Sequence, residues 1–358
     1  MHRASAVRDQ TWGRAVTYSR KVFAPLTNMC RDTCAYCTFV KHPDDPAAQI
    51  MTPEQVLALA QRGERQGCKE LLFSLGEKPE LRYAMARKRL SQLGFERMTD
   101  YLADMCALVL SETSLLPHVN AGTLSDDEID RLKPVCASMG MMLETVSRRL
   151  TRKGGPHHAC PDKVPVQRLR TLERAGQKKV PFTTGLLIGI GETWAERLDA
   201  LEAINASHRR HRHIQEVIIQ NFQRKPDIAM AQHPEPSLDD MLKTLAAARL
   251  ILDPEISLQA PPNLQRRHID YLDAGINDWG GISPVTIDYI NPQHDWPQLQ
   301  KLADSCASAG FTLTERLTVY PRFMERDSGF LAPSLAERIA AMARHDGLAR
   351  AQCLEATG

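Results

Sequence analysis

The sequence lacks the features that place a protein in a membrane or on a polyanion. Among its 358 residues, no apolar run approaches the roughly 20 residues that cross a bilayer. The first residues, MHRASAVRDQTWGR, contain no apolar segment of the kind found in signal peptides. The formal net charge is only +2, from 45 Lys and Arg against 43 Asp and Glu, which provides no broad basic field for nucleic acid. We therefore expect a cytoplasmic protein with a small-molecule substrate, no nucleic-acid partner and no membrane association.

Linkers and low-complexity tracts are also missing, while 43% of the residues are hydrophobic, enough for a sizeable core. Short β-branched apolar runs alternate with amphipathic helices, three of which begin with a capping-box pattern at Thr52, Ser125 and Thr193. Eight of the runs are predicted strands, at residues 21–26, 70–75, 116–120, 141–145, 182–188, 216–222, 256–260 and 275–279. Eight strand–helix units predict an α/β fold, a closed (β/α)8 barrel of the TIM type with its active site at the carboxyl ends of the strands.

The two ends of the chain extend beyond these eight units. Residues 1–17 are expected to form an N-terminal extension, residues 18–320 the barrel, and residues 321–358 a helical C-terminal tail. A helix from about residue 295, a strand-like run at 311–320 and a helix from Ser334 follow the eighth strand. We expect these last elements to plug or cap the barrel.

Cysteine is used in two ways in this sequence. Cys30, Cys34 and Cys37 lie together, with C-x3-C-x2-C spacing, directly after the first predicted strand. Three thiolates on one tight loop can each bind one iron of a 4Fe-4S cluster, which leaves the fourth iron without a protein ligand. The other six cysteines are spread singly, and unpaired cysteine usually behaves as a small buried hydrophobe. We expect free core thiols at Cys68, Cys106, Cys136, Cys160, Cys306 and Cys353.

Two other sites could explain the clustered cysteines. A structural zinc ion prefers four protein ligands, and His42 or the patch at residues 157–160 could complete such a site in a non-catalytic, zinc-stabilised protein. A redox pair at Cys34 and Cys37 would leave Cys30 without a role, and that pair does not open a helix. No second cysteine pair exists, which favours the iron–sulfur interpretation.

The spacing of the three cysteines resembles that of the radical S-adenosylmethionine (SAM) superfamily. In that superfamily the open iron binds the amino and carboxylate groups of SAM, and the resemblance implies both cofactors here. Gly76 and Glu77 follow the second predicted strand and are similar to the Gly-Gly-Glu element that receives the SAM ammonium group. Glycine permits close backbone approach, and the carboxylate matches the cation. Tyr36, inside the cysteine loop, is a further SAM contact that the resemblance implies.

Two later strand ends complete the expected SAM site. Glu144 lies in an apolar run, where a carboxylate should be paired or functional, and is expected to contact the ribose or amino group of SAM. An ion pair with Arg148 or Arg149 is the alternative. Gly189 and Ile190 belong to a segment similar to the G-x-I-x-G-x-x-E element that lies beside the adenine. A phosphate-binding loop is disfavoured there because the Lys and the Ser or Thr of that motif are missing.

The run of His and Arg at residues 208–213 is similar in composition to a metal or anion site. It precedes a predicted strand and therefore falls on the face of the barrel opposite the expected chemistry. We expect a solvated connection between a helix and a strand, with no functional role.

Longer stretches narrow the resemblance within the superfamily. The family of first subunits of 7,8-didemethyl-8-hydroxy-5-deazariboflavin synthase is similar to this chain at residues 18–23, 34–39, 75–80, 213–222 and 275–286. The likeness runs from about Tyr18 to Tyr320, and the single three-cysteine loop matches a free first subunit rather than a fusion of both. Departures from the family pattern occur at Gln223, Asp227, Gln265, Arg266 and Ile287.

The resemblance implies a radical SAM lyase of deazaflavin biosynthesis. In this family a partner subunit joins tyrosine to 5-amino-6-ribitylaminouracil, and the first subunit closes the third ring. A 5'-deoxyadenosyl radical made from SAM takes hydrogen from the joined substrate, 5-amino-5-(4-hydroxybenzyl)-6-(D-ribitylimino)-5,6-dihydrouracil. Cyclisation then releases ammonia, and methionine and 5'-deoxyadenosine are the co-products. The resemblance also implies a reducing protein such as ferredoxin or flavodoxin.

Polar residues at strand ends are expected to contact the substrate, the alternative being hydrogen bonds within loops. They are Asn120, Gln220, Asn221, Gln259, Asn263 and Asp278. The sequence identifies no acid or base for cyclisation. Other radical SAM enzymes of similar barrel type remain alternatives, namely the partner subunit, a menaquinone-pathway enzyme and a biotin synthase-like enzyme.

Overall fold

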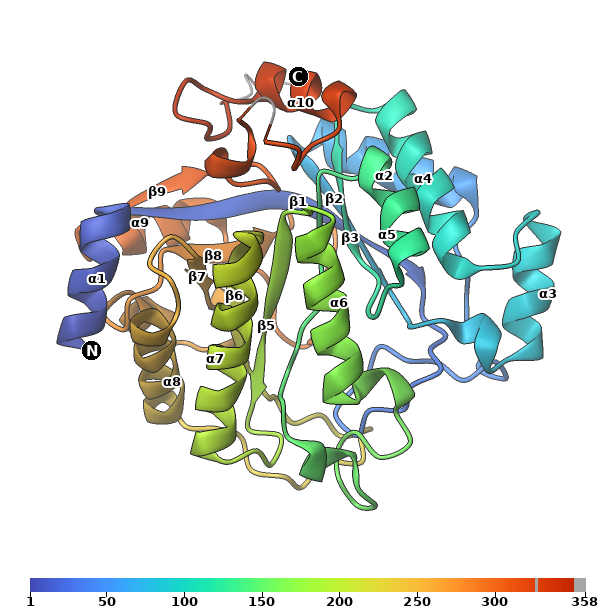
Figure 1. Cartoon of the computed structure of the whole chain (residues 1–358), viewed down its shortest axis with the longest axis horizontal. Coiled ribbons are helices and arrows are strands. Elements are labelled where there is room, and N and C mark those ends of the chain that lie inside the picture. The colour runs from blue at the N-terminus through green and yellow to red at the C-terminus, as the bar shows by residue number, and fades with distance from the viewer. Residues whose placement is uncertain (326–327, 351–358) are drawn as a thin grey trace.

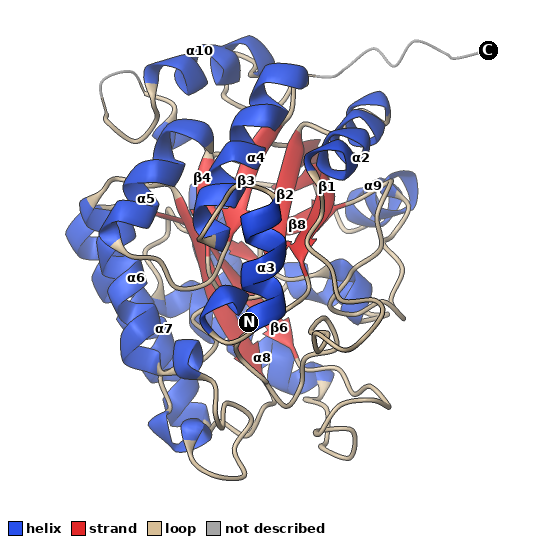
Figure 2. Ribbon diagram, turned by 90° about the vertical axis from the view of Figure 1, so that its right-hand side faces the viewer, coloured by secondary structure: helices blue, strands red, loops and turns tan. Residues whose placement is uncertain are grey.

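The computed structural model of the chain describes residues 1–325 and 328–350. Eight parallel strands follow one another around a closed barrel in the order β2-β3-β4-β5-β6-β7-β8-β1, and β1 pairs with β2 to complete the ring. Helices surround the strands (Figure 2). The predicted (β/α)8 fold is confirmed. The strands are β1 (Ala15–Thr27), β2 (Glu70–Leu75), β3 (Leu116–Asn120), β4 (Ser138–Gly140), β5 (Phe182–Ile188), β6 (Ile214–Asn221), β7 (Ser257–Gln259) and β8 (Asp278–Ile282).

Capping boxes begin several of the helices. The three predicted ones are present at Thr52, Ser125 and Thr193, and Ser237 adds a fourth. Within the described residues, no helix combines the length and apolar character needed to cross a membrane. The helices are α1 (His2–Trp12), α2 (Pro53–Arg65), α3 (Ala84–Gln92), α4 (Met98–Glu112), α5 (Asp126–Leu132), α6 (Pro165–Gln177), α7 (Trp194–His211), α8 (Leu238–Ile251), α9 (Leu299–Ser308) and α10 (Pro333–Met342).

The fourth strand lies three residues earlier than predicted, at 138–140 instead of 141–145. Glu144 has a left-handed backbone, with φ 64°, which ends the extended run, and only an isolated bridge links it to β5. The apolar run continues past the strand because Met141 and Met142 line the cavities at its end. Hydrophobicity alone therefore misplaced this strand.

The eighth strand is displaced in the other direction, to 278–282 instead of 275–279. Gly275 adopts φ 96° in the turn before the strand. The glycine-rich segment after it continues the strand, although glycine has low strand propensity. A Cβ on Gly280 would lie 1.9 Å from the Nε2 atom of Gln259, so the barrel interior has no room for a side chain there.

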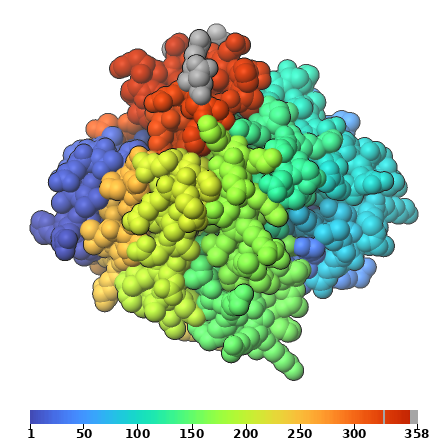
Figure 3. Space-filling view, viewed as in Figure 1, coloured from blue at the N-terminus to red at the C-terminus, as the bar shows by residue number. Residues whose placement is uncertain are grey.

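The last described strand, β9 (Thr312–Glu315), and the residues that follow it close the amino-terminal end of the barrel. β9 pairs with β1, and residues 316–320 then enter the barrel end as a plug. The guanidinium of Arg316 lies 2.8 Å from a carboxylate oxygen of Glu216 and 3.0 Å from one of Asp278. Figure 1 shows the C-terminal segment, in red, at this end of the barrel, opposite the long loops, and Figure 3 shows the same red segment on the surface of the molecule. The floor of the barrel is therefore ionic and buried.

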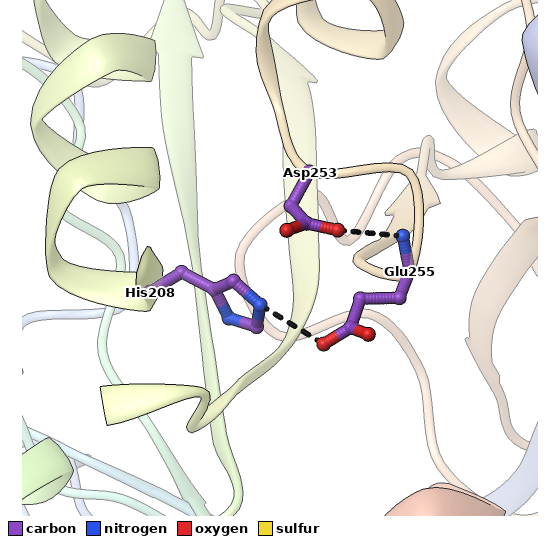
Figure 4. Close-up of side chains that lie close together, drawn as sticks. All are labelled: His208, Asp253 and Glu255. Atoms are coloured by element: carbon purple, nitrogen blue, oxygen red, sulfur yellow. Dashed lines mark hydrogen bonds and ion pairs between the residues drawn. The ribbon is translucent and has the colours of Figure 1, made fainter. Parts of the chain in front are cut away.

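The His and Arg run before β6 is only partly solvated, so the prediction was wrong for two of its histidines. His208 and His213 are fully buried, and burial lowers the pKa of His208 to about 4. The Nε2 atom of His208 lies 3.2 Å from Glu255, beside Asp253 (Figure 4). Arg212 pairs with both carboxylates, at 2.7 Å and 2.5 Å. These ion pairs join α7 to the α8–β7 connection.

We expect Arg316→Leu to lower the free energy of unfolding by about 3–5 kcal/mol, because two buried carboxylates lose their counter-charge. Arg344→Leu is the matched control, since it breaks a solvent-exposed ion pair with Asp346 and should leave the free energy of unfolding close to that of the wild type. Denaturant unfolding followed by circular dichroism measures both variants. Equal losses would contradict a structural role for the ionic floor.

Candidate active site

The three clustered cysteines lie on the loop after β1, at the carboxyl ends of the strands. All three line one cavity, the outer cavity, together with residues from other strand ends. The backbone N–H groups of Asp32 and Glu77 donate to the Cys30 sulfur at 3.4 Å and 3.1 Å. Burial raises the pKa of the Cys30 thiol to about 12, so a metal that takes this ligand must displace its proton.

The cysteine loop is held against the long connection between β4 and α6. Ala35 donates its N–H to the carbonyl of Pro156 at 2.9 Å, and Thr33 donates to the sulfur of Cys160 at 3.3 Å. A hydrogen bond with Cys160 raises the pKa of Cys34. Cys160 is therefore a neighbour of the candidate site, which its distance along the chain concealed.

The prediction of free core thiols is confirmed wherever the structure describes them. The buried, unbridged cysteines are Cys68, Cys106, Cys136, Cys160 and Cys306. Cys353 lies outside the described residues.

Gly76 and Glu77 join the end of β2 to the cysteine loop. A Cβ on Gly76 would lie 2.0 Å from the carbonyl oxygen of Met29, so only glycine lets the two backbones meet. The Glu77 carboxylate accepts hydrogen bonds from the N–H and hydroxyl of Thr123, at 2.5 Å and 2.7 Å, and from Arg168 at 3.3 Å. A ligand cation in the outer cavity would meet a carboxylate that is already fixed in position.

Glu144 lies at the centre of a second polar cluster in the outer cavity. It forms an ion pair with Lys163, accepts a hydrogen bond from Tyr36, and lies 3.0 Å from the Nε2 atom of His157. Burial opposes ionisation, but Lys163 and His157 hold the pKa of Glu144 well below its usual value. The alternative pairing with Arg148 or Arg149 is wrong, because Lys163 takes that place.

Gly189 and Ile190 lie beside the outer cavity rather than in its lining. Their N–H groups donate to the Glu192 carboxylate at 2.8 Å and 2.9 Å. Ile190 packs in an apolar cluster with Leu187 and Tyr36, both of which line the cavity. Contact of these two residues with adenine stays a prediction.

A second, inner cavity adjoins the outer one within the barrel, and the two share Ser74, Asn120, Met142, Gln220, Ile290 and Asn291. The rings of Phe23 and Trp296 stack in its wall, with centroids 5.3 Å apart and planes at 4°. Its floor carries charged and polar groups from four strands and the plug. They are Lys21, Glu70, His118, Glu216, Arg316 and Thr318.

Four of the six predicted substrate contacts line these cavities, namely Asn120, Gln220, Asn221 and Gln259. Asn221 faces the outer cavity, and its buried Oδ1 atom has no hydrogen-bond partner among the described residues. The other two residues make bonds within the fold. Asn263 donates to Asp288 at 3.0 Å, and Asp278 binds Arg316.

Three cationic side chains of the outer cavity were absent from the predicted site. Lys163 lies in the connection after β4, Arg168 lies on α6, and Lys225 lies in the connection after β6. The one signal in the sequence is that Arg168 falls on the otherwise apolar face of α6, beside Leu172 and Ala175. A charged residue on a buried face indicates a partner or a function.

Comparison with known proteins identifies the family of this chain. Residues 24–204 match the profile of the radical SAM superfamily. A 7,8-didemethyl-8-hydroxy-5-deazariboflavin synthase from Methanopyrus kandleri is 46% identical over 336 residues, which cover 94% of this chain and 100% of that protein. The chain belongs to this family of radical SAM proteins. The family implies a 4Fe-4S cluster and SAM.

Other similar proteins differ from this chain in length or are more distant in sequence. An FO synthase from Mycobacterium leprae is 48% identical over 365 residues, which cover 97% of this chain and 42% of that protein. The chain thus spans about two fifths of the longer relative. The FeFe-hydrogenase maturase HydG from Carboxydothermus hydrogenoformans shares the fold, with a TM-score of 0.70 at 19% identity over 94% of this chain and 79% of that one.

Proposed function

We propose that Cys30, Cys34 and Cys37 hold three irons of a 4Fe-4S cluster and that SAM occupies the remainder of the outer cavity. Membership of the radical SAM superfamily implies both groups. The residue assignment is supported by the cavity lining, because these three are the only described cysteines in it. Their spacing and their common loop suit a cluster with one open iron.

The chemistry of the outer cavity fits such ligands. Three buried polar atoms of its lining residues have no partner among the described residues: Oδ2 of Asp32, Nε of Arg168 and Oδ1 of Asn221. Buried polar atoms are normally hydrogen-bonded, and a polar ligand would supply the missing partners. The two N–H groups at the Cys30 sulfur are of the kind that tune an iron–sulfur cluster.

The cluster, held by Cys30, Cys34 and Cys37, would supply the electron for cleavage of SAM to methionine and a 5'-deoxyadenosyl radical. Glu77 would receive the ammonium group of SAM, since Thr123 and Arg168 fix its carboxylate. Tyr36 and Glu144 would bind the ribose or amino group, and Gly189 and Ile190 would border the adenine. The surrounding loops bury Glu77, Glu144 and Ile190, which would limit the access of water to a reactive intermediate.

We assign the inner cavity to the substrate, the adduct of tyrosine with the ribityl-substituted uracil. The stacked rings of Phe23 and Trp296 offer a flat apolar wall to an aromatic ring. The amides of Asn120, Gln220 and Gln259 offer donors and acceptors to a uracil and a polyol. Because the cavities share walls, a radical formed in the outer one would have the substrate within reach.

The reaction we propose is closure of the third ring of 7,8-didemethyl-8-hydroxy-5-deazariboflavin, with release of ammonia. One observation carries this proposal: the M. kandleri synthase is matched over its whole length, whereas the M. leprae FO synthase is matched over 42% of its length. A separate partner subunit would then join tyrosine to the uracil. A reducing protein such as ferredoxin or flavodoxin would supply the electron.

Anaerobic turnover tests this function. The reconstituted protein, given SAM, a chemical reductant and the preformed adduct, is expected to produce fluorescent deazaflavin together with ammonia. Chromatography with mass detection quantifies both products. Cleavage of SAM without any deazaflavin would contradict the substrate assignment while leaving the radical SAM chemistry in place.

We expect Glu77→Gln to retain the cluster but to weaken SAM binding roughly tenfold to a hundredfold, since a charge-assisted hydrogen bond in a closed site is lost. Glu112→Gln, at the exposed end of α4, is the matched control and should bind SAM like the wild type. Anaerobic calorimetry gives the affinities, and visible absorption gives the cluster content. Equal affinity in Glu77→Gln and the control would place the ammonium group of SAM elsewhere.

A further inference from the structure

His118 is a titratable group of the inner cavity to which the proposed function assigns no role. It lies on β3, two residues before Asn120, and is 6% exposed. Its ring lines the cavity, and its Nε2 atom has no hydrogen-bond partner among the described residues. A Cβ on Gly140 would lie 3.0 Å from this Nε2, so glycine on β4 leaves space for the ring.

The other ring nitrogen of His118 is anchored to the barrel floor. Nδ1 lies 2.7 Å from the hydroxyl of Ser138 and 3.3 Å from that of Thr318. The Ser138 hydroxyl donates to the Thr318 carbonyl at 3.2 Å. The same hydroxyl lies 2.8 Å from the Thr318 hydroxyl, so Thr318 offers two acceptors for its single proton. With that proton donated to Thr318, the Ser138 oxygen accepts the N–H at Nδ1, and this is the tautomer that we assign. The lone pair of the neutral imidazole is then on Nε2, at the cavity.

Charged groups from three elements face the imidazole of His118: Glu70 on β2, Lys21 on β1 and Arg316 in the plug. Burial lowers the pKa of His118 to about 4, and the two cations add to this effect while Glu70 opposes it. The imidazole is therefore neutral near neutral pH and has a lone pair available for a proton.

The carboxylates of the inner cavity are already engaged. Glu70 pairs with Lys21 at 2.7 Å, and Glu216 pairs with Arg316 at 2.8 Å. Asp288, at the rim, accepts the backbone N–H groups of residues 290 and 291 at 2.9 Å and 3.0 Å. Amide side chains in the wall cannot take up a proton. His118 is the neutral, unpaired base that remains in the lining of this cavity.

We propose that His118 is a catalytic residue that accepts, on Nε2, the proton that the substrate loses as its third ring becomes aromatic. This inference rests on the proposed function. In that reaction the adduct loses ammonia, a hydrogen atom to the 5'-deoxyadenosyl radical, and a proton. In the assigned step an N–H or O–H bond of the substrate breaks, its electron pair stays on the substrate, and an N–H bond forms on His118. The electron lost alongside the proton would return to the 4Fe-4S cluster of the proposed function, which SAM cleavage would have left oxidised.

A weak base suits this step. Removal of a hydrogen atom from the adduct makes its remaining N–H and O–H bonds much more acidic, so that a weakly basic imidazole suffices. The imidazolium that results faces the carboxylate of Glu70 and keeps its Nδ1 hydrogen bond to Ser138.

The test is His118→Gln, with the fate of SAM and the fate of the adduct followed separately. We expect unchanged cluster content and unchanged adduct binding by calorimetry. Formation of 5'-deoxyadenosine in the presence of the adduct should continue. Deazaflavin formation should fall by roughly 10²–10⁴-fold, which is the usual contribution of a general base. The ratio of 5'-deoxyadenosine to deazaflavin therefore rises.

Two further variants accompany this one. Ser138→Ala keeps the imidazole but removes the anchor of Nδ1, so it should show the same change of ratio to a smaller degree. That variant decides the question if His118→Gln does not fold. His211→Gln, on α7 beside Glu173 at the other end of the barrel, is the matched control and should behave like the wild type.

Each other outcome overturns the inference in a recognisable way. Equal deazaflavin formation by wild type and His118→Gln overturns this inference and leaves the proposed function in place. Loss of 5'-deoxyadenosine together with deazaflavin in a folded variant would show that His118 acts in binding or radical formation, and overturns it too. A wild-type protein that makes no deazaflavin from the adduct overturns the proposed function, and this inference with it.

Discussion

Cys34→Ala is expected to abolish both cluster incorporation and SAM cleavage. The cluster would keep two thiolate anchors of three, in a cavity where no other described cysteine stands in for the third. The same loss is expected for Cys30→Ala and Cys37→Ala. Iron and sulfide analysis, visible absorption and release of 5'-deoxyadenosine measure the effect in protein reconstituted without oxygen.

Two control variants sharpen this test. Cys136→Ala removes a buried thiol that does not line the outer cavity and should keep full iron content and activity. Cys160→Ala removes the neighbour of Cys34, and the protein is still expected to hold its cluster, because Cys160 does not line the outer cavity. A colourless wild-type protein that holds zinc, or full iron and activity in Cys34→Ala, would contradict the cluster assignment.

Tyrosine and 5-amino-6-ribitylaminouracil, supplied as separate molecules, are expected to give no deazaflavin with this chain alone. The target hydrogen must lie next to the nascent radical, and a site shaped for two joined rings positions separate pieces poorly. The inner cavity also offers one stacked aromatic wall and one charged floor, which suits a single extended ligand. The preformed adduct should be sufficient.

The matched comparison uses the same protein, SAM and reductant with either the adduct or its two precursors. Slow cleavage of SAM without product is compatible with the account in both mixtures. Efficient formation of the coupled adduct from the free precursors by this chain alone would assign the partner's role to it instead.

Local patterns in the sequence predicted much of this fold. Capping boxes at Thr52, Ser125 and Thr193 depend on residues three positions apart, and all three are present. The cysteine spacing likewise predicted three thiols that line one cavity. Such features need no knowledge of tertiary contacts. The predicted boundaries of β4 and β8 were displaced because residues after β4 and within β8 line the inner cavity. The space in the cavity, rather than strand propensity, determines which residue types occur there.

The polar contacts of the site were harder to predict because they join distant segments. Lys163 was absent from the predicted site, yet it is the ion-pair partner of Glu144. Cys160 resembled any buried thiol, yet it contacts the cysteine loop. His118 lies within a short apolar strand, where a buried histidine is usually structural. Only the closed barrel shows that its free nitrogen faces the cavity beside Asn120.

Transfer of hydrogen from the substrate to 5'-deoxyadenosine tests the central claim most directly. An adduct deuterated throughout, incubated in D2O with SAM and reductant, should yield deazaflavin and 5'-deoxyadenosine that carries deuterium. Mass spectrometry of the 5'-deoxyadenosine reads the transfer. Deazaflavin formed without 5'-deoxyadenosine, or with 5'-deoxyadenosine that carries no deuterium, would contradict a radical SAM mechanism on this substrate.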